Sequence, residues 1–280
     1  MSRLPYLTQA RAPLTQEVSA VNEFGELSSV SVPAERALTV YVDKRELVTL
    51  MTLGAEPELL VLGFLRNQRL VRSPREVESI TVDWDVGAAA VKTRRGISDL
   101  RARTAKRVVT TGCGQGSVFG DLMDEVDQLV LPSATLTQSQ LYGIVNVIRQ
   151  QESTYKSAGS VHGCALFRAE EMLLFVEDVG RHNAIDTIAG WMWLQDMEGT
   201  DKVFYTTGRL TSEMVIKSAQ MGVPIVVSRS GITQMGHQVA QRLGLCAIGR
   251  ATNKRFLCYT GAERLQLQPE LADRGLRSSG

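Results

Sequence analysis

The sequence predicts a two-unit α/β protein, in which a strand-rich first unit precedes a mostly parallel sheet with helices on its faces. Three observations predict this class. The 280 residues are enough for two domains of about 150 residues each. Strand and helix patterns alternate through the second half, as in parallel α/β sheets, whereas the first half is mainly strand-like. We expect a strand-rich α+β N-terminal domain at residues 15–110, a cysteine loop and linker at 111–133, and the sheet domain at 134–270.

Short apolar stretches define the elements of the first unit. Two of them flank the polar residues 43–46, which predicts a β-hairpin. Pro57 begins a mainly apolar run that ends near Leu65. This run predicts a short buried helix, because proline is favoured in the first helical turn. The predicted strands are residues 38–42, 47–51, 80–82 and 88–91.

A basic stretch lies at the end of the first unit. Between Arg66 and Arg107 the chain has 11 basic and 5 acidic residues, which gives a formal charge of +6. Such a stretch is commonly a solvated surface. The alternative is an electropositive surface that leads toward a functional segment.

Helices and strands alternate regularly in the second unit. Apolar residues recur at helical spacing in residues 141–148 and 185–192, which predicts two helices. Gly222 and Gly244 follow two further helical stretches, where a left-handed cap is favoured. The remaining predicted helices are 212–221 and 234–243, and the predicted strands are 164–167, 172–176, 203–206, 225–227 and 245–248.

Composition and charge argue against several classes of protein. The 31 basic and 30 acidic side chains give a net charge of +1, which does not favour a nucleic-acid-binding protein. No apolar run reaches the roughly 18 residues of a membrane span, and the first residues lack a signal-peptide pattern. We therefore expect a cytoplasmic protein without membrane insertion.

The cysteines and histidines form no metal-binding pattern. The four cysteines are not in CxxC spacing, and the three histidines match no zinc motif, so we expect no zinc. Cys164, Cys246 and Cys258 are expected in the core. Cys113 lies between two glycines, which leave a thiol accessible to another reactant and favour a functional role.

Three strand-to-helix junctions share the same chemistry. They are residues 177–183, 206–212 and 228–233, and each contains an arginine, a glycine and a short side chain that can cap a helix. Ligands of parallel sheets bind at the carboxyl ends of the strands. Guanidinium groups and helix N-termini there bind phosphate. The junctions therefore predict a phosphate site. The alternative for the junctions is that they only cap helices, and the alternative for His182 is a structural role.

Four segments of the second half resemble the motifs of the FdhD family of formate dehydrogenase accessory sulfurtransferases. They are residues 177–186 (EDVGRHNAID), 208–217 (GRLTSEMVIK), 222–225 (GVPI) and 228–230 (SRS). The resemblance extends more loosely over residues 34–260. It implies a cytidine-deaminase-like mixed sheet with helices on both faces but without the zinc of that fold.

The resemblance also implies a function. Members of the family transfer persulfide sulfur from a cysteine desulfurase to the molybdenum or tungsten bis-guanine-dinucleotide cofactor, before it enters the formate dehydrogenase catalytic subunit. This implies a sulfurtransferase with a persulfide on Cys113 and a homodimeric assembly. The residues expected to bind the cofactor are Arg181, His182, Asn183, Gly208, Arg209, Ser212, Ser228, Arg229, Ser230 and Thr233.

The cysteine loop departs from the family pattern. The family has CxxC in this loop, but Gly116 occupies the second position here. Transfer through a single persulfide remains available, and the alternative is a cofactor-binding and delivery chaperone without sulfur transfer. Thr187 and Gly231-Ile232 also differ from the common Lys and Ala-Pro. Deaminase-type hydrolysis is a third interpretation, which the missing zinc ligands oppose.

Overall fold

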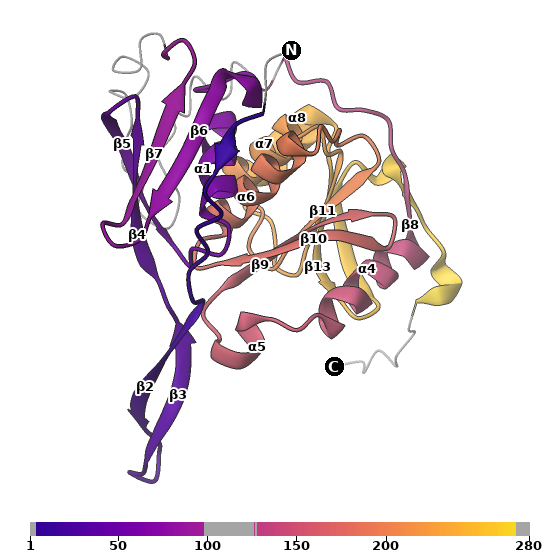
Figure 1. Ribbon diagram of the computed structural model, residues 1–280. Coiled ribbons are helices and arrows are strands. Elements are labelled where there is room, and N and C mark those ends of the chain that lie inside the picture. The colour runs from indigo at the N-terminus through magenta and orange to yellow at the C-terminus, as the bar shows by residue number, and fades with distance from the viewer. Residues whose placement is uncertain (1–3, 98–125, 127, 273–280) are drawn as a thin grey trace. The chain divides into compact units, whose positions relative to one another are not determined.

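The computed structural model describes residues 4–97, 126 and 128–272 (Figure 1). The chain divides into two compact units, and each unit draws on several separate stretches of the sequence. The sequence suggested contiguous ranges instead, and the domain division at 15–110, 111–133 and 134–270 stays a prediction. The first unit comprises Met1–Leu122, Glu152–Cys164 and Val176–Met197, and the second comprises Met123–Gln151, Ala165–Phe175 and Glu198–Gly280.

A five-stranded mixed sheet forms the centre of the first unit, with the strand order β1-β6-β7-β4-β5. β4 pairs antiparallel with β5 and parallel with β7, and β6 is antiparallel to β7. The predicted hairpin and the two further predicted strands are therefore confirmed. The bounds are β1 Tyr6–Leu7, β4 Arg36–Val42, β5 Arg45–Thr52, β6 Val77–Asp83 and β7 Ala88–Thr93.

Helix α1 (Pro57–Asn67) covers this sheet, which confirms the predicted short helix. Its residues Leu60 and Phe64 are buried in one apolar cluster with Leu38 and Ile80 of the sheet. Alternate residues of β4 are fully buried, as expected for a strand with one face on a core. The core of the first unit therefore lies between the sheet and α1.

Helix α6 (Arg181–Leu194) packs against α1, and two glycines allow the close approach. A Cβ atom placed on Gly63 of α1 would lie 1.7 Å from the Asp186 carbonyl oxygen. A Cβ atom on Gly190 of α6 would lie 2.1 Å from the Leu59 carbonyl oxygen. The backbones of the two helices are thus in direct contact, and no larger side chain fits there without separating them.

Hydrogen bonds also join α1 to α6. Asn67 donates from Nδ2 to Asp186 Oδ1 over 2.7 Å, and Arg66 donates from Nη1 to the Ala189 carbonyl oxygen over 3.1 Å. The Arg66 guanidinium lies 5.1 Å from the ring centroid of Trp193. Burial lowers the pKa of Arg66 to about 10.

A separate antiparallel hairpin extends from the first unit (Figure 1). It consists of β2 (Thr15–Val21) and β3 (Leu27–Pro33). Asn22 forms the turn, because its Oδ1 accepts hydrogen bonds from the N–H groups of Phe24 and Glu26. The side chains of this hairpin are mostly exposed. Its sequence therefore has no strong alternation, and only a general strand character was predicted for it.

A six-stranded sheet carries the second unit, with the strand order β10-β9-β11-β12-β13-β14. The strands β11, β12 and β13 are mutually parallel, and β14 is antiparallel to β13. The predicted alternation of strands and helices is thus confirmed, whereas β14 was not predicted. The bounds are β9 His162–Arg168, β10 Glu171–Asp178, β11 Lys202–Thr206, β12 Ile225–Ser228, β13 Cys246–Thr252 and β14 Arg255–Thr260.

Helices lie on both faces of the sheet in the second unit. Helix α4 (Gln138–Gln150) packs Leu141 and Ile144 against Tyr205 and Val227 on one face. Helices α7 (Ser212–Gln220) and α8 (Gln234–Leu243) lie on the other face (Figure 1). Gly244 ends α8 in the left-handed conformation, as predicted. The mixed α/β class is therefore confirmed.

Shorter elements complete the described chain. None of the helices in the described part is long and apolar enough to cross a membrane. The short elements are β8 Leu136–Thr137, α5 Thr154–Ala158, β15 Leu265–Gln266 and the 3-10 turns Pro74–Glu76, Ala262–Arg264 and Pro269–Leu271.

Candidate functional site

Two of the predicted arginine-bearing junctions lie at one edge of the parallel sheet. β11 ends at Thr206 and β12 ends at Ser228, and these two residues are partners in the register of the parallel pair. The loops that follow lead into the N-termini of α7 and α8. The structure therefore places both loops at the carboxyl edge of the sheet, where ligands of α/β proteins bind.

Backbone hydrogen bonds join these two loops. The Leu210 N–H donates to the Gly231 carbonyl oxygen over 2.9 Å, and the Thr233 N–H donates to the Leu210 carbonyl oxygen over 3.0 Å. Leu210 and Ile232 form an isolated parallel bridge. We call this set of contacts the loop clasp. It holds residues 209 and 229 on neighbouring segments of one surface.

Several of the predicted site residues build the loops themselves. The buried Ser228 hydroxyl donates to the Gly208 carbonyl oxygen over 2.7 Å and accepts from the Ser230 N–H over 2.9 Å. Thr233 caps α8, because its Oγ1 accepts from the Gly236 N–H over 3.1 Å. These contacts fix the loop conformations. Ligand contacts of the same residues stay predictions.

Arg209 and Arg229 are the exposed cations of the two loops. Within the described residues, neither guanidinium has a hydrogen bond or ion pair. Thr211 begins α7 without a capping hydrogen bond, and its buried Oγ1 has no hydrogen-bond partner among the described residues. A buried hydroxyl normally has a partner. Two guanidinium groups, a helix N-terminus and a hydroxyl thus form a surface that can hold phosphate oxygens.

The third predicted junction belongs to the first unit and is organised around Asp178. This residue is 4% exposed. Its Oδ2 accepts hydrogen bonds from Thr52 Oγ1 over 2.5 Å and from the Leu53 N–H over 3.3 Å. Its Oδ1 accepts from the Gly180 N–H over 3.1 Å and from Asn183 Nδ2 over 2.9 Å. Burial raises the pKa of Asp178, and the four hydrogen bonds lower it in part.

The other residues of this junction are largely buried. Arg181 is 9% exposed and His182 is 4% exposed, and both lie in the first turn of α6. Asn183 donates from Nδ2 to the Met51 carbonyl oxygen over 2.6 Å as well as to Asp178. Asn183 therefore joins α6 to the β5 strand. Cofactor contacts of Arg181, His182 and Asn183 stay predictions.

Replacing Asp178 with asparagine should destabilise the protein by about 1 to 3 kcal/mol. The new amide nitrogen would face two of the four hydrogen-bond donors that now surround the carboxylate, and buried donors without acceptors are costly. Chemical denaturation measures the free energy of unfolding. The matched control is Asp85→Asn, because Asp85 is exposed. Equal free energies of unfolding for both variants would contradict the structural role of Asp178.

Cys113 lies outside the described residues. Of the described cysteines, Cys164 and Cys246 are fully buried, which confirms their predicted place in the core, and Cys258 is half-buried. The Cys246 and Cys258 sulfur atoms are 4.0 Å apart, and this contact lowers the pKa of Cys258. Among the described residues, no group of three His, Cys, Asp or Glu side chains could hold a metal ion.

Sequence reasoning missed two residues of these sites. Thr52 binds Asp178 across 126 positions of the sequence, and no local pattern marks such a contact. Thr211 did have a signal, since a threonine directly before a helical stretch is a candidate N-cap. Its missing capping bond became visible only in the structure.

The fold and the loop clasp define a mixed α/β protein with two arginines presented at the carboxyl edge of a parallel sheet. The FdhD/NarQ family model matches residues 33–266, and the chain belongs to this family. The resemblance found in the sequence motifs is thus confirmed. One relative is the sulfur carrier protein FdhD of Bacillus subtilis, which is 32% identical over 87% of this chain and 94% of its own length.

A second relative agrees with this assignment, and a solved structure has the same fold. The sulfur carrier protein FdhD of Listeria monocytogenes is 33% identical over 86% of this chain and 94% of its own length. The crystal structure of a proposed formate dehydrogenase accessory protein from Desulfotalea psychrophila has a TM-score of 0.72 and 24% identity. It covers 90% of this chain and 100% of its own. This likeness shows the shared fold.

Proposed function

We propose that the protein is a sulfur carrier required for formate dehydrogenase activity. It takes persulfide sulfur from a cysteine desulfurase and passes it to the molybdenum or tungsten bis-guanine-dinucleotide cofactor, which is its cargo. Family membership and the names of the relatives support a sulfur carrier. The observation that carries the cofactor-binding part of the proposal is the loop clasp, which presents Arg209 and Arg229 together.

The loop clasp fits the phosphates of a guanine dinucleotide. Each guanidinium can donate two parallel hydrogen bonds to one phosphate group. The α7 N-terminus adds the positive end of a helix dipole, and Thr211 Oγ1 adds a hydroxyl near it. Ser212 lies in the first turn of the same helix.

Cys113 is the proposed sulfur-carrying residue. Its thiolate would attack the outer sulfur of a desulfurase persulfide, which forms the Cys113 persulfide and releases the desulfurase cysteine as a thiolate. The basic residues Lys106 and Arg107 before the loop favour the thiolate form. Gly116 leaves no second loop cysteine to displace the outer sulfur, so the persulfide remains available for the cargo.

A cofactor-binding and delivery chaperone without sulfur transfer is the second candidate function. The glycine at position 116, where the family has its second cysteine, favours it. Both candidates share the loop clasp as the binding site, and they differ only in the need for Cys113. A homodimer, a cytoplasmic location and a cytidine-deaminase-like sheet belong to the proposal as implications of the resemblance.

Alanine substitutions of Arg209 and Arg229 should each weaken GDP binding by about 1.5 to 3 kcal/mol, the range for hydrogen bonds to charged groups. GDP serves as the probe because it contains the guanine and phosphates of the cargo. Isothermal titration calorimetry measures the affinity. Added salt should weaken binding, because it screens the attraction between guanidinium and phosphate groups.

The matched control is Arg242→Ala. Arg242 is exposed in the last turn of α8, at the opposite end of that helix from the loop clasp. This variant should bind GDP as the unmodified protein does. Unchanged affinity in both test variants would show that these two junctions serve only the fold.

A further inference from the structure

The first unit contains a cationic pocket that the proposed function does not use. The pocket has a volume of about 600 Å³, within the range of small-molecule sites. Its charged lining residues are Arg69, Arg72, Arg75, Arg94, Arg95 and Glu76, which carry a formal charge of +4. The basic stretch seen in the sequence therefore gathers part of its charge in one concave site.

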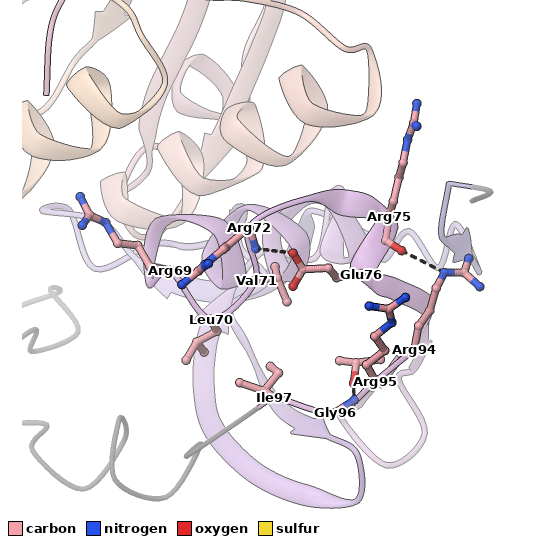
Figure 2. Close-up of a pocket in the computed structure, with 11 residues that line it drawn as sticks. Arg69, Leu70, Val71, Arg72, Arg75, Glu76, Arg94, Arg95, Gly96 and Ile97 are labelled. Atoms are coloured by element: carbon pink, nitrogen blue, oxygen red, sulfur yellow. Dashed lines mark hydrogen bonds between the residues drawn. The ribbon is translucent and has the colours of Figure 1, made fainter. Parts of the chain in front are cut away.

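The pocket has an apolar floor and charged sides. Figure 2 shows the side chains of Leu70 and Ile97 facing one another, with Arg72 on one side and Arg94 and Arg95 on the other. Leu70 and Val71 are 4% and 3% exposed and also belong to the core of the first unit. The floor is therefore part of the core of the first unit, and Figure 2 shows the Arg69 and Arg75 guanidinium groups directed outward from it.

Arg69 occupies a backbone conformation that favours glycine. It follows the C-terminus of α1 with φ of 55°. The Arg69 N–H donates to the Arg66 carbonyl oxygen over 2.8 Å, and the Leu70 N–H donates to the Leu65 carbonyl oxygen over 2.8 Å. This is a Schellman motif, whose left-handed position is usually glycine. Glycine would fit this backbone conformation without strain, so the side chain of Arg69 can be removed without a cost in backbone strain.

Hydrogen bonds hold the opposite sides of the pocket in place. Arg94 donates from Nε to the Arg75 carbonyl oxygen over 2.9 Å, and its N–H donates to the Glu76 carbonyl oxygen over 2.9 Å. The Glu76 Oε1 atom accepts from the Arg72 N–H over 3.2 Å. The 3-10 turn Pro74–Glu76 is thus joined to residues 72 and 94. The sides of the pocket are ordered before any ligand enters.

We propose that this pocket binds an organic polyphosphate of the size of a nucleoside triphosphate. Guanidinium groups match phosphate oxygens in geometry and charge. The arginines of the lining supply positive charge for a triphosphate chain, and the apolar floor can contact the organic part of the ligand. Its concave shape and limited volume favour a small molecule over a peptide chain, for which an open groove would be needed.

ATP binding tests the proposal, with isothermal titration calorimetry on the full chain. All proteins carry Arg209→Ala and Arg229→Ala, so that the loop clasp contributes no arginine to the measurement. This parent protein should bind ATP. Adding Arg72→Gln with Arg95→Gln should weaken binding at least about tenfold, since two charge-assisted contacts are lost.

A glycine substitution separates binding from stability. Arg69→Gly should weaken ATP binding several-fold, about the effect of one lost charged contact, while the melting temperature stays equal or rises because the strained conformation suits glycine. The matched control is Lys44→Gly, since Lys44 also has a positive φ of 69° and is exposed, but lies outside the pocket. That control should leave the ATP affinity unchanged.

Three results would overturn the proposal. The first is that the parent protein does not bind ATP. The second is that adding Arg72→Gln with Arg95→Gln leaves the ATP affinity of the parent protein unchanged. The third is that a hexaglutamate peptide binds the parent protein more tightly than ATP does. The pocket would then be a docking surface for an acidic protein segment. None of these outcomes depends on sulfur transfer or on GDP binding.

Discussion

Replacing Cys113 with alanine is expected to abolish the activation of formate dehydrogenase while the protein still folds. Sulfur transfer needs an accessible thiolate. Gly112 and Gly114 flank Cys113 in the sequence, whereas Cys164 and Cys246 are fully buried. The assay is formate dehydrogenase activity in cells whose own sulfur carrier is replaced by the variant. Mass spectrometry after incubation with a cysteine desulfurase and cysteine should find added sulfur on Cys113 of the unmodified protein.

The matched control for this experiment is Cys258→Ser. Cys258 is half-buried, whereas Cys164 and Cys246 are fully buried, so Cys258 is the most accessible of the described cysteines. We expect this variant to activate formate dehydrogenase normally and to carry sulfur on Cys113. Normal activation by Cys113→Ala would instead support the chaperone function without sulfur transfer. If Cys258→Ser lost activation and Cys113→Ala did not, Cys258 would be the residue that carries the sulfur.

Replacing Gly63 with alanine should produce a large loss of stability, of at least about 3 kcal/mol, at the upper end of overpacking effects. The new methyl group would lie 1.7 Å from the Asp186 carbonyl oxygen. Backbone atoms cannot move aside as a flexible side chain can, so α1 and α6 would have to separate. Separation would also disturb the bonds from Asn67 and Arg66 to α6. Chemical denaturation measures the change in the free energy of unfolding.

Gly231→Ala is the control for this substitution. A Cβ atom there would meet no other atom within 4 Å, and Gly231 does not have a positive φ. Its free energy of unfolding should therefore change by less than about 0.5 kcal/mol. A similarly small change for Gly63→Ala would show that the two helices tolerate separation and that their close contact contributes little to stability.

The sequence was informative where local patterns decide the structure. The hairpin of β4 and β5, the helix α1 and the alternating elements from β11 to β13 follow from apolar periodicity and from Gly222 and Gly244. The hairpin of β2 and β3 was not resolved into strands, because its side chains are mostly exposed and carry no alternation. The strand β14 was missed because five of its six residues are exposed or half-buried, so it lacks a run of buried apolar residues.

The candidate site could be predicted in part. Strand-to-helix junctions with arginine and glycine were visible as sequence motifs, and the structure places residues 206–212 and 228–233 at one sheet edge. The role of Ser228 depends on a contact with a distant segment, which no local pattern encodes, whereas the cap that Thr233 forms on α8 is local and was visible as a capping side chain in the sequence. The contact between Thr52 and Asp178 and the glycines at the crossing of α1 and α6 were unpredictable for the same reason.

The loop clasp has a consequence for the thermodynamics of ligand binding. Two independent loops would each lose conformational entropy when a ligand ordered them. Here the bonds of Leu210 to Gly231 and Thr233 already restrict both loops in the folded protein, so that entropy is lost during folding instead. The same bonds make the two arginines energetically coupled, because displacement of one loop shifts the other. Their contributions to affinity in a double-mutant cycle should therefore be non-additive.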